Sequence, residues 1–92
     1  MGAVADLLER KLTGAFSPIR LLVDDDSARH AGHAGASQVG ESHFNVVIES
    51  AAFEGLSRVQ RQRMVYAALA EELAGPVHAL SVKALAPGEE AG

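Results

Sequence analysis

Residues 42–49 read SHFNVVIE, and this stretch decides the fold. Phe44, Val46 and Ile48 alternate along it with the residues between them. Successive side chains of a strand point to opposite faces, so this period is typical of a strand with one buried face. The stretch therefore predicts a strand in a sheet that is covered on one side.

A tight turn and a second helix are predicted after this strand. The turn is FEGL, residues 53–56. Ser57 is a favourable N-cap and Gln60 stands three residues later, which fits a capping box. The helix presents one apolar face, formed by Met64, Val65, Ala68, Leu69 and Leu73. Gly75-Pro76 is expected to end it.

The N-terminal segment has the spacing of an amphipathic helix. Its apolar residues recur at intervals of three and four, at Val4, Leu7, Leu8 and Leu12. Glycine readily takes the left-handed conformation beyond a helix end, so Thr13-Gly14 is the predicted stop.

Two further strands complete the prediction, over residues 19–23 and from 77 to about 85. In the last strand Leu80, Val82 and Ala84 share one face. The order is helix, strand, long loop, strand, helix, strand. This order predicts an α+β domain whose helices cover one face of a three-stranded sheet. The second and third strands bracket a helix, as in a right-handed crossover unit.

Residues 27–41 are rich in glycine and alanine and carry His30 and His33. We interpret this segment as a long mobile loop, because unstructured loops of this length in compact domains are usually functional or disordered. The predicted domain spans residues 1–86, and the small, polar residues 87–92 are expected to form a flexible tail.

Composition excludes several classes of protein. The chain of 92 residues has no cysteine, so it has neither disulfides nor a thiol nucleophile. No apolar run approaches the ~20 residues that span a bilayer, and we expect a cytoplasmic protein that does not bind membranes. The net charge of −4 argues against broad electrostatic binding of nucleic acid. Ser57 and Ser81 have no evident base and orienting acid, so the chain is not expected to be an enzyme.

Six short stretches together resemble the BolA family. They are DDS (25–27) with a histidine shortly after, SHFNV (42–46), FEGL (53–56), RQRMVY (61–66), EEL (71–73) and VHAL (77–80). The similarity covers roughly residues 4–87. Gln62 departs from the pattern, since the family usually has histidine between the two arginines.

The resemblance implies a KH-like (class II) αββαβ fold with an element like a helix-turn-helix. It also implies pairing with a monothiol glutaredoxin around a shared [2Fe–2S] cluster, in iron–sulfur assembly and trafficking. His78 corresponds to the family's cluster ligand. A second ligand comes from the long loop, where His30 and His33 both remain candidates.

Chemistry alone leaves His78 ambiguous. In a strand that starts at residue 77 it has the parity of Leu80 and Val82, so a half-buried structural histidine is the alternative interpretation. His43 is expected to be structural. Iron–sulfur clusters are usually held by thiolates, with histidine as a known substitute. A chain without cysteine must therefore borrow thiolates, here from the glutaredoxin cysteine and glutathione.

Gly55, Arg58, Arg61 and Arg63 form the second candidate site, at the start of the second helix. Arginines at a helix N-terminus can meet phosphate oxygens. The alternative is a solvated helix face whose arginines pair with nearby acids.

The sequence therefore predicts a non-enzymatic adaptor of iron–sulfur metabolism. A DNA-binding transcriptional regulator is the second hypothesis. The isolated chain is expected to be a monomer or weak homodimer without a cofactor of its own.

Overall fold

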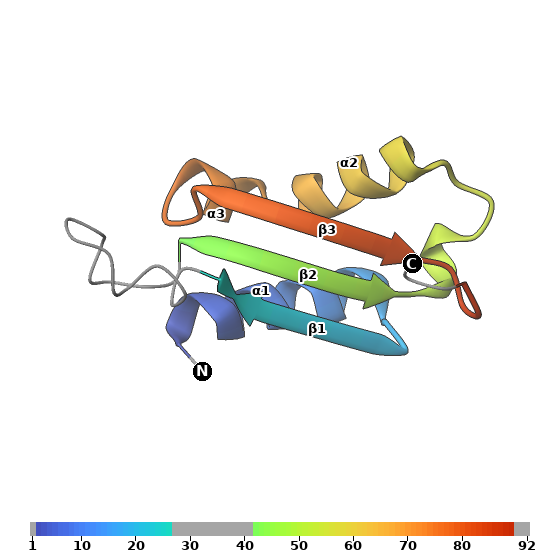
Figure 1. The fold of residues 1–92 in the computed structure, drawn as a ribbon, viewed down its shortest axis with the longest axis horizontal. Helices are drawn as coiled ribbons and strands as arrows, with labels where there is room; N and C mark the ends of the chain where they lie inside the picture. The colour runs from blue at the N-terminus through green and yellow to red at the C-terminus, as the bar shows by residue number, and fades with distance from the viewer. Residues whose placement is uncertain (1, 27–41, 90–92) are drawn as a thin grey trace.

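The computed structural model describes residues 2–26 and 42–89 (Figure 1). Their elements are α1 (Ala3–Phe16), β1 (Arg20–Asp25), β2 (His43–Glu49), the 3-10 helix η2 (Ala51–Phe53), α2 (Arg58–Ala68), α3 (Ala70–Ala74) and β3 (Ala79–Leu85). The predicted mobile loop over 27–41 lies outside the described residues.

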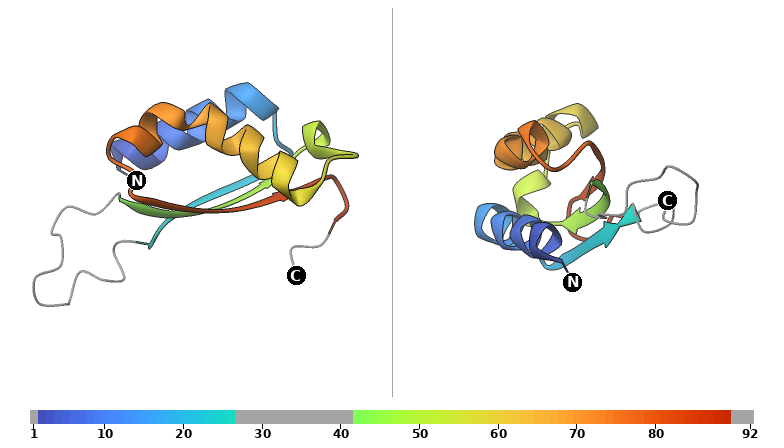
Figure 2. Two further views of the ribbon diagram at one scale, coloured as in Figure 1. Left: turned by 90° about the horizontal axis from the view of Figure 1, so that it is seen from above. Right: turned by 90° about the vertical axis from the view of Figure 1, so that its left-hand side faces the viewer.

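The strands form one sheet in the order β1-β2-β3. β1 is antiparallel to β2, and β2 is parallel to β3. Figure 2 shows α1, α2 and α3 on one face of this sheet, and no helix of the described residues covers the other face. The predicted α+β architecture is confirmed, including the parallel pair around the α2 crossover.

The core lies between the sheet and the helices. On β2 the predicted alternation is confirmed, because Phe44, Val46 and Ile48 are all buried. Leu8 and Leu12 of α1 pack against this face of the sheet. Burial of these apolar side chains is the main stabilising contribution.

Phe53 joins the end of α1 to the turn before α2. It is fully buried, and its ring centroid lies 5.1 Å from that of Phe16. Beside this pair, the buried Ser50 hydroxyl donates to the Phe16 carbonyl at 2.6 Å and accepts from the Ala52 amide at 3.1 Å. The last turn of α1 is thereby fixed to the chain that follows β2.

The predicted stop of α1 at Gly14 is wrong, because the helix continues to Phe16. The residue that takes the left-handed conformation is Ser17, with φ 44°, and its amide donates to the Thr13 carbonyl at 3.0 Å. Pro18 follows at once and disfavours an α-helical residue before it. Tertiary packing of Phe16 thus outweighs the local tendency of glycine to end a helix.

The second predicted helix divides into α2 and α3 at Leu69. Ser57 and Gln60 form the predicted capping box, with hydrogen bonds of 3.2 and 2.9 Å. At Leu69 the backbone departs from helical geometry, and its amide is shared between the carbonyls of Val65 and Tyr66. Leu69 is fully buried. The bend therefore occurs where its side chain enters the core.

An ion pair connects α1 to α3. Lys11 of α1 lies 2.7 Å from the buried carboxylate of Glu72 on α3. The hydrogen bond to Glu72 is the largest cause that raises the pKa of Lys11.

No helix among the described residues is long and apolar enough to cross a membrane.

Candidate functional site

His78 lies between α3 and β3, with its side chain exposed to solvent. β3 starts at Ala79, one residue after it, so the half-buried strand position considered for this histidine is wrong. The backbone fixes its location. The amide of His78 donates to the Ser42 carbonyl at 2.7 Å, and the Ala79 amide donates to the same carbonyl at 3.1 Å.

Asp26 and Ser42, the described residues on either side of segment 27–41, lie at the end of the sheet where His78 lies. β1 ends at Asp25, whose register partner on β2 is Phe44. His43, the first residue of β2, has Ala79 as its register partner on β3 (Figure 1). His30 and His33 lie outside the described residues.

His43 is a second histidine at this end, and sequence reasoning did not select it as a functional residue. Its side chain is exposed on β2. A hollow of about 170 Å³ lies beside it, lined by Asp26, His43, Phe44, Asn45, Ala79, Leu80 and Ser81. The parity of His43, opposite to that of Phe44, was the signal that placed it on the open face of the sheet.

Residues 2–26 and 42–89 contain no group of three or more histidine, cysteine or acidic side chains that could hold a metal ion. Within these residues the structure brings His78 and His43 to one end of the sheet. An imidazole needs only a neutral ring nitrogen to ligate a metal. This end therefore offers the exposed imidazole of His78 to a site that ligands from elsewhere would complete.

The arginines at the start of α2 separate into two kinds. Arg58 and Arg63 are exposed. Arg61 is turned inward, with only 12% of its side chain exposed. Gly55 occupies the preceding turn with φ 76°, in the left-handed region that glycine adopts most easily.

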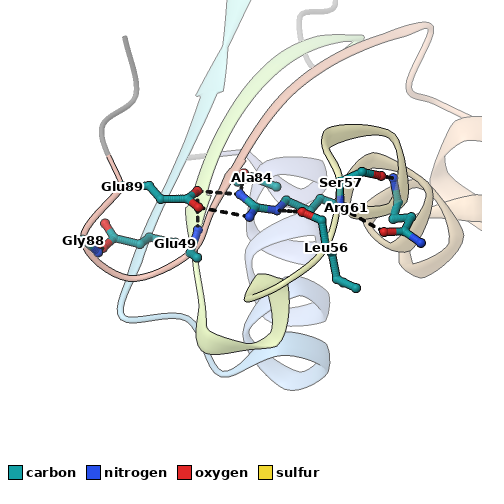
Figure 3. Close-up of polar contacts among 9 residues, drawn as sticks. Glu49, Leu56, Ser57, Arg61, Ala84, Gly88 and Glu89 are labelled. Carbon is teal, nitrogen blue, oxygen red and sulfur yellow. Dashed lines mark hydrogen bonds and ion pairs between the residues drawn. The ribbon is translucent and has the colours of Figure 1, made fainter.

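Arg61 joins the start of α2 to the end of β3 and the turn that follows it (Figure 3). Its Nε donates to the Leu56 carbonyl at 3.0 Å, and its Nη1 donates to the Ala84 carbonyl at 3.1 Å. The two terminal nitrogens bind the two carboxylate oxygens of Glu89. Such a bidentate pair has fixed geometry. Arg61 is therefore a structural residue, and it is not part of a solvated helix face.

The residues just after β3 are held by the same contacts. The Glu89 carboxylate also accepts from the Ala86 amide at 2.9 Å, and the Gly88 amide donates to Glu49 at 3.0 Å. Residues 87–89 thus form a turn bonded to the domain, where the sequence had indicated a flexible tail. Residues 90–92 lie outside the described part of the chain.

The charge of Glu89 should make this turn sensitive to acid. The hydrogen bond from Arg61, and then that from the Ala86 amide, lower the pKa of Glu89 from 4.5 to about 2. A carboxylate whose pKa is lower in the folded state stabilises the fold fully above its unfolded pKa. That contribution is lost as the pH falls from about 4.5 through about 2.

We therefore expect Glu89→Gln to reduce the free energy of unfolding at pH 7, with a difference from the parent that shrinks below about pH 4.5. Urea unfolding of both proteins between pH 7 and about 2.5 measures this difference. A difference that stays constant over the whole range would show that the charge of Glu89 contributes nothing.

Side chains of α2 also occupy the outer edge of β3. Three of them donate to the carbonyls of alternate strand residues: Tyr66 to Leu80 at 3.1 Å, Gln62 to Val82 at 3.4 Å and Arg61 to Ala84 at 3.1 Å. We call these the β3-edge contacts. Gln62, the departure from the family pattern, here serves as one of the three donors.

Comparison with known proteins agrees with this architecture. A family model described as BolA-like protein matches residues 12–89. BolA-like protein 1 of Homo sapiens is 46% identical over 89 residues, which are 97% of this chain and 62% of the relative. The chain thus spans less than two thirds of that relative's length. The DNA-binding transcriptional regulator BolA of Escherichia coli is 46% identical, over 86% of this chain and 71% of the regulator.

Among solved structures, the BolA domain of SufE1 from Arabidopsis thaliana superposes with a TM-score of 0.85. It is 40% identical, and the alignment covers 98% of this chain and 99% of that domain. Fold, family model and identity agree over nearly the whole sequence, and on these grounds the chain belongs to the BolA-like protein family.

Proposed function

We propose that this protein is a non-enzymatic adaptor of iron–sulfur assembly and trafficking, which shares a [2Fe–2S] cluster with a monothiol glutaredoxin. One observation carries the proposal. His78 is exposed, and its backbone is fixed to Ser42, where the segment with His30 and His33 rejoins the sheet. The two donors that the family resemblance requires would thus come from neighbouring parts of the chain.

The donor chemistry of the chain fits a shared cluster. The chain has no cysteine, so it has no thiolate to offer. His78 and one of His30 and His33 would supply imidazoles to one iron, and the glutaredoxin cysteine with glutathione would supply thiolates. Histidine ligation raises the reduction potential of such a cluster. The chain itself contributes binding and orientation, which suits a cytoplasmic carrier without catalytic residues.

We expect His78→Ala to abolish the coloured complex with a monothiol glutaredoxin. The substitution removes a metal–nitrogen bond, and the methyl side chain of alanine has no atom that can ligate iron. The measurement is anaerobic reconstitution with iron, sulfide and glutathione, followed by visible absorption and circular dichroism of the purified mixture.

His43→Ala is the matched control, because it removes another exposed histidine at the same end of the sheet. It should leave the complex spectrum unchanged. His30→Ala and His33→Ala, tested separately, identify the second ligand, since only one of them should disturb the spectrum. A mixture that shows only the glutaredoxin homodimer spectrum with the parent protein would contradict the adaptor function.

DNA binding is the second candidate function. It is favoured by the exposure of Arg58 and Arg63 on α2 and by the name of the Escherichia coli relative. Arg58→Ala with Arg63→Ala should weaken binding to duplex DNA and reduce its dependence on salt, because each lost phosphate contact lowers the slope. Arg61 is unsuitable for this test, since its replacement disturbs the fold. Unchanged affinity in the double variant would contradict this function.

A further inference from the structure

The sheet has two outer strands, β1 and β3, and their outer edges differ in the contacts they make. At the β3 edge, the three β3-edge contacts occupy outward carbonyl groups. Occupied edge groups cannot pair with another strand. At the opposite edge, no described element pairs with the outer side of β1 (Figure 1). Within the described residues, β1 is therefore the edge on which a further strand can form hydrogen bonds.

β1 also exposes a large apolar side chain. Leu21 and Val23 point toward the helices and pack in or against the core. Side chains alternate along a strand, so Arg20, Leu22 and Asp24 project from the opposite, open face. Leu22 is 60% exposed. The open face of β1 thus carries one apolar side chain, with Arg20 two positions before it and Asp24 two positions after it. The exposed Arg20 side chain also lies 3.8 Å from Glu49 of its own chain.

This pattern is complementary to itself. We propose that β1 pairs antiparallel with β1 of a second copy of the chain, about a two-fold axis at Leu22. Leu22 then lies opposite the partner's Leu22. Arg20 lies opposite the partner's Asp24, and Asp24 lies opposite the partner's Arg20. The two sheets join into one, with the helices of both copies on the same face.

The faces of the sheet select this register. Residues directly opposite each other in an antiparallel pair lie on the same face, so a slip of one residue would bring core-facing side chains opposite open-face ones. Centring the axis on Leu21 instead would place Arg20 opposite the partner's Leu22. Centring it on Val23 would place Leu22 opposite the partner's Asp24. Only the axis at Leu22 brings the opposite charges together.

The absence of cysteine makes a direct test possible. Directly opposite Cα atoms in an antiparallel pair lie about 4.5–5.5 Å apart, which is within the range that a disulfide spans. Leu22→Cys should therefore form a disulfide-linked dimer under mild oxidation. The matched control is Val59→Cys, which replaces another exposed apolar residue, 57% exposed on α2. We expect cross-linking at position 22 to be at least about tenfold faster than at position 59.

A charge exchange tests the register in the same cysteine variant. Arg20→Asp or Asp24→Arg alone places like charges opposite each other twice in the dimer, and each should slow cross-linking by about tenfold. The two changes together restore opposite charges and should restore the rate. Thermal unfolding of each variant checks that the monomer remains folded. Equal cross-linking at positions 22 and 59, or single exchanges without effect, would overturn the proposal.

Discussion

Phe53→Ala is expected to lower the free energy of unfolding by about 4 kcal/mol. Phe53 is fully buried, and its ring lies against Phe16, so the substitution removes a large apolar surface and leaves a cavity. Small domains have only about 5–15 kcal/mol of stability in total. The variant should therefore be partly unfolded at moderate temperature.

Urea unfolding followed by circular dichroism measures the loss, with Val59→Ala as the control. Val59 is 57% exposed, and surface substitutions of this kind usually change stability by about 0.5 kcal/mol or less. A loss below about 1 kcal/mol for Phe53→Ala would show that the end of α1 and the turn before α2 do not depend on this contact.

Arg61→Ala is expected to cost about 2 kcal/mol. The side chain donates to the carbonyls of Leu56 and Ala84 and pairs with Glu89, so its loss leaves acceptors of three segments without their donor. Arg61→Lys should recover little of this stability, because a single ammonium group cannot reproduce the planar fork of the guanidinium.

Arg63→Ala is the control for this variant, since Arg63 lies exposed on the same helix. Hydrogen exchange adds a local measurement: the amides of Ala86 and Gly88, which are bonded to Glu89 and Glu49, should lose protection in Arg61→Ala alone. Equal stability of the Arg61 and Arg63 variants would contradict the structural role of Arg61.

Elements that depend on neighbouring residues could be predicted from the sequence. The alternation of β2 and the capping box of Ser57 and Gln60 arise within a few residues, and both are confirmed. The end of α1 could not be predicted, because Phe16 is held by Phe53 and Ser50, which are distant in the chain. The bend at Leu69 likewise follows from packing in the core.

In the candidate site, too, local features could be predicted from the sequence and features that depend on distant residues could not. His78 could be selected by its resemblance to a family ligand, but its exposure depended on where β3 starts, and parity arguments are unreliable at a strand boundary. The structural role of Arg61 depends on Glu89, 28 residues further along the chain. Local charge pattern gave no indication of that pairing.

The β3-edge contacts limit how far the protein can assemble. A sheet with two reactive edges can add copies at both sides and grow into a filament, as exposed edges do in aggregation. Here Tyr66, Gln62 and Arg61 occupy carbonyls along one edge. If two copies join through β1, each outer edge of the pair carries three carbonyls that are already bonded to α2 side chains. These contacts oppose the addition of further copies by strand pairing.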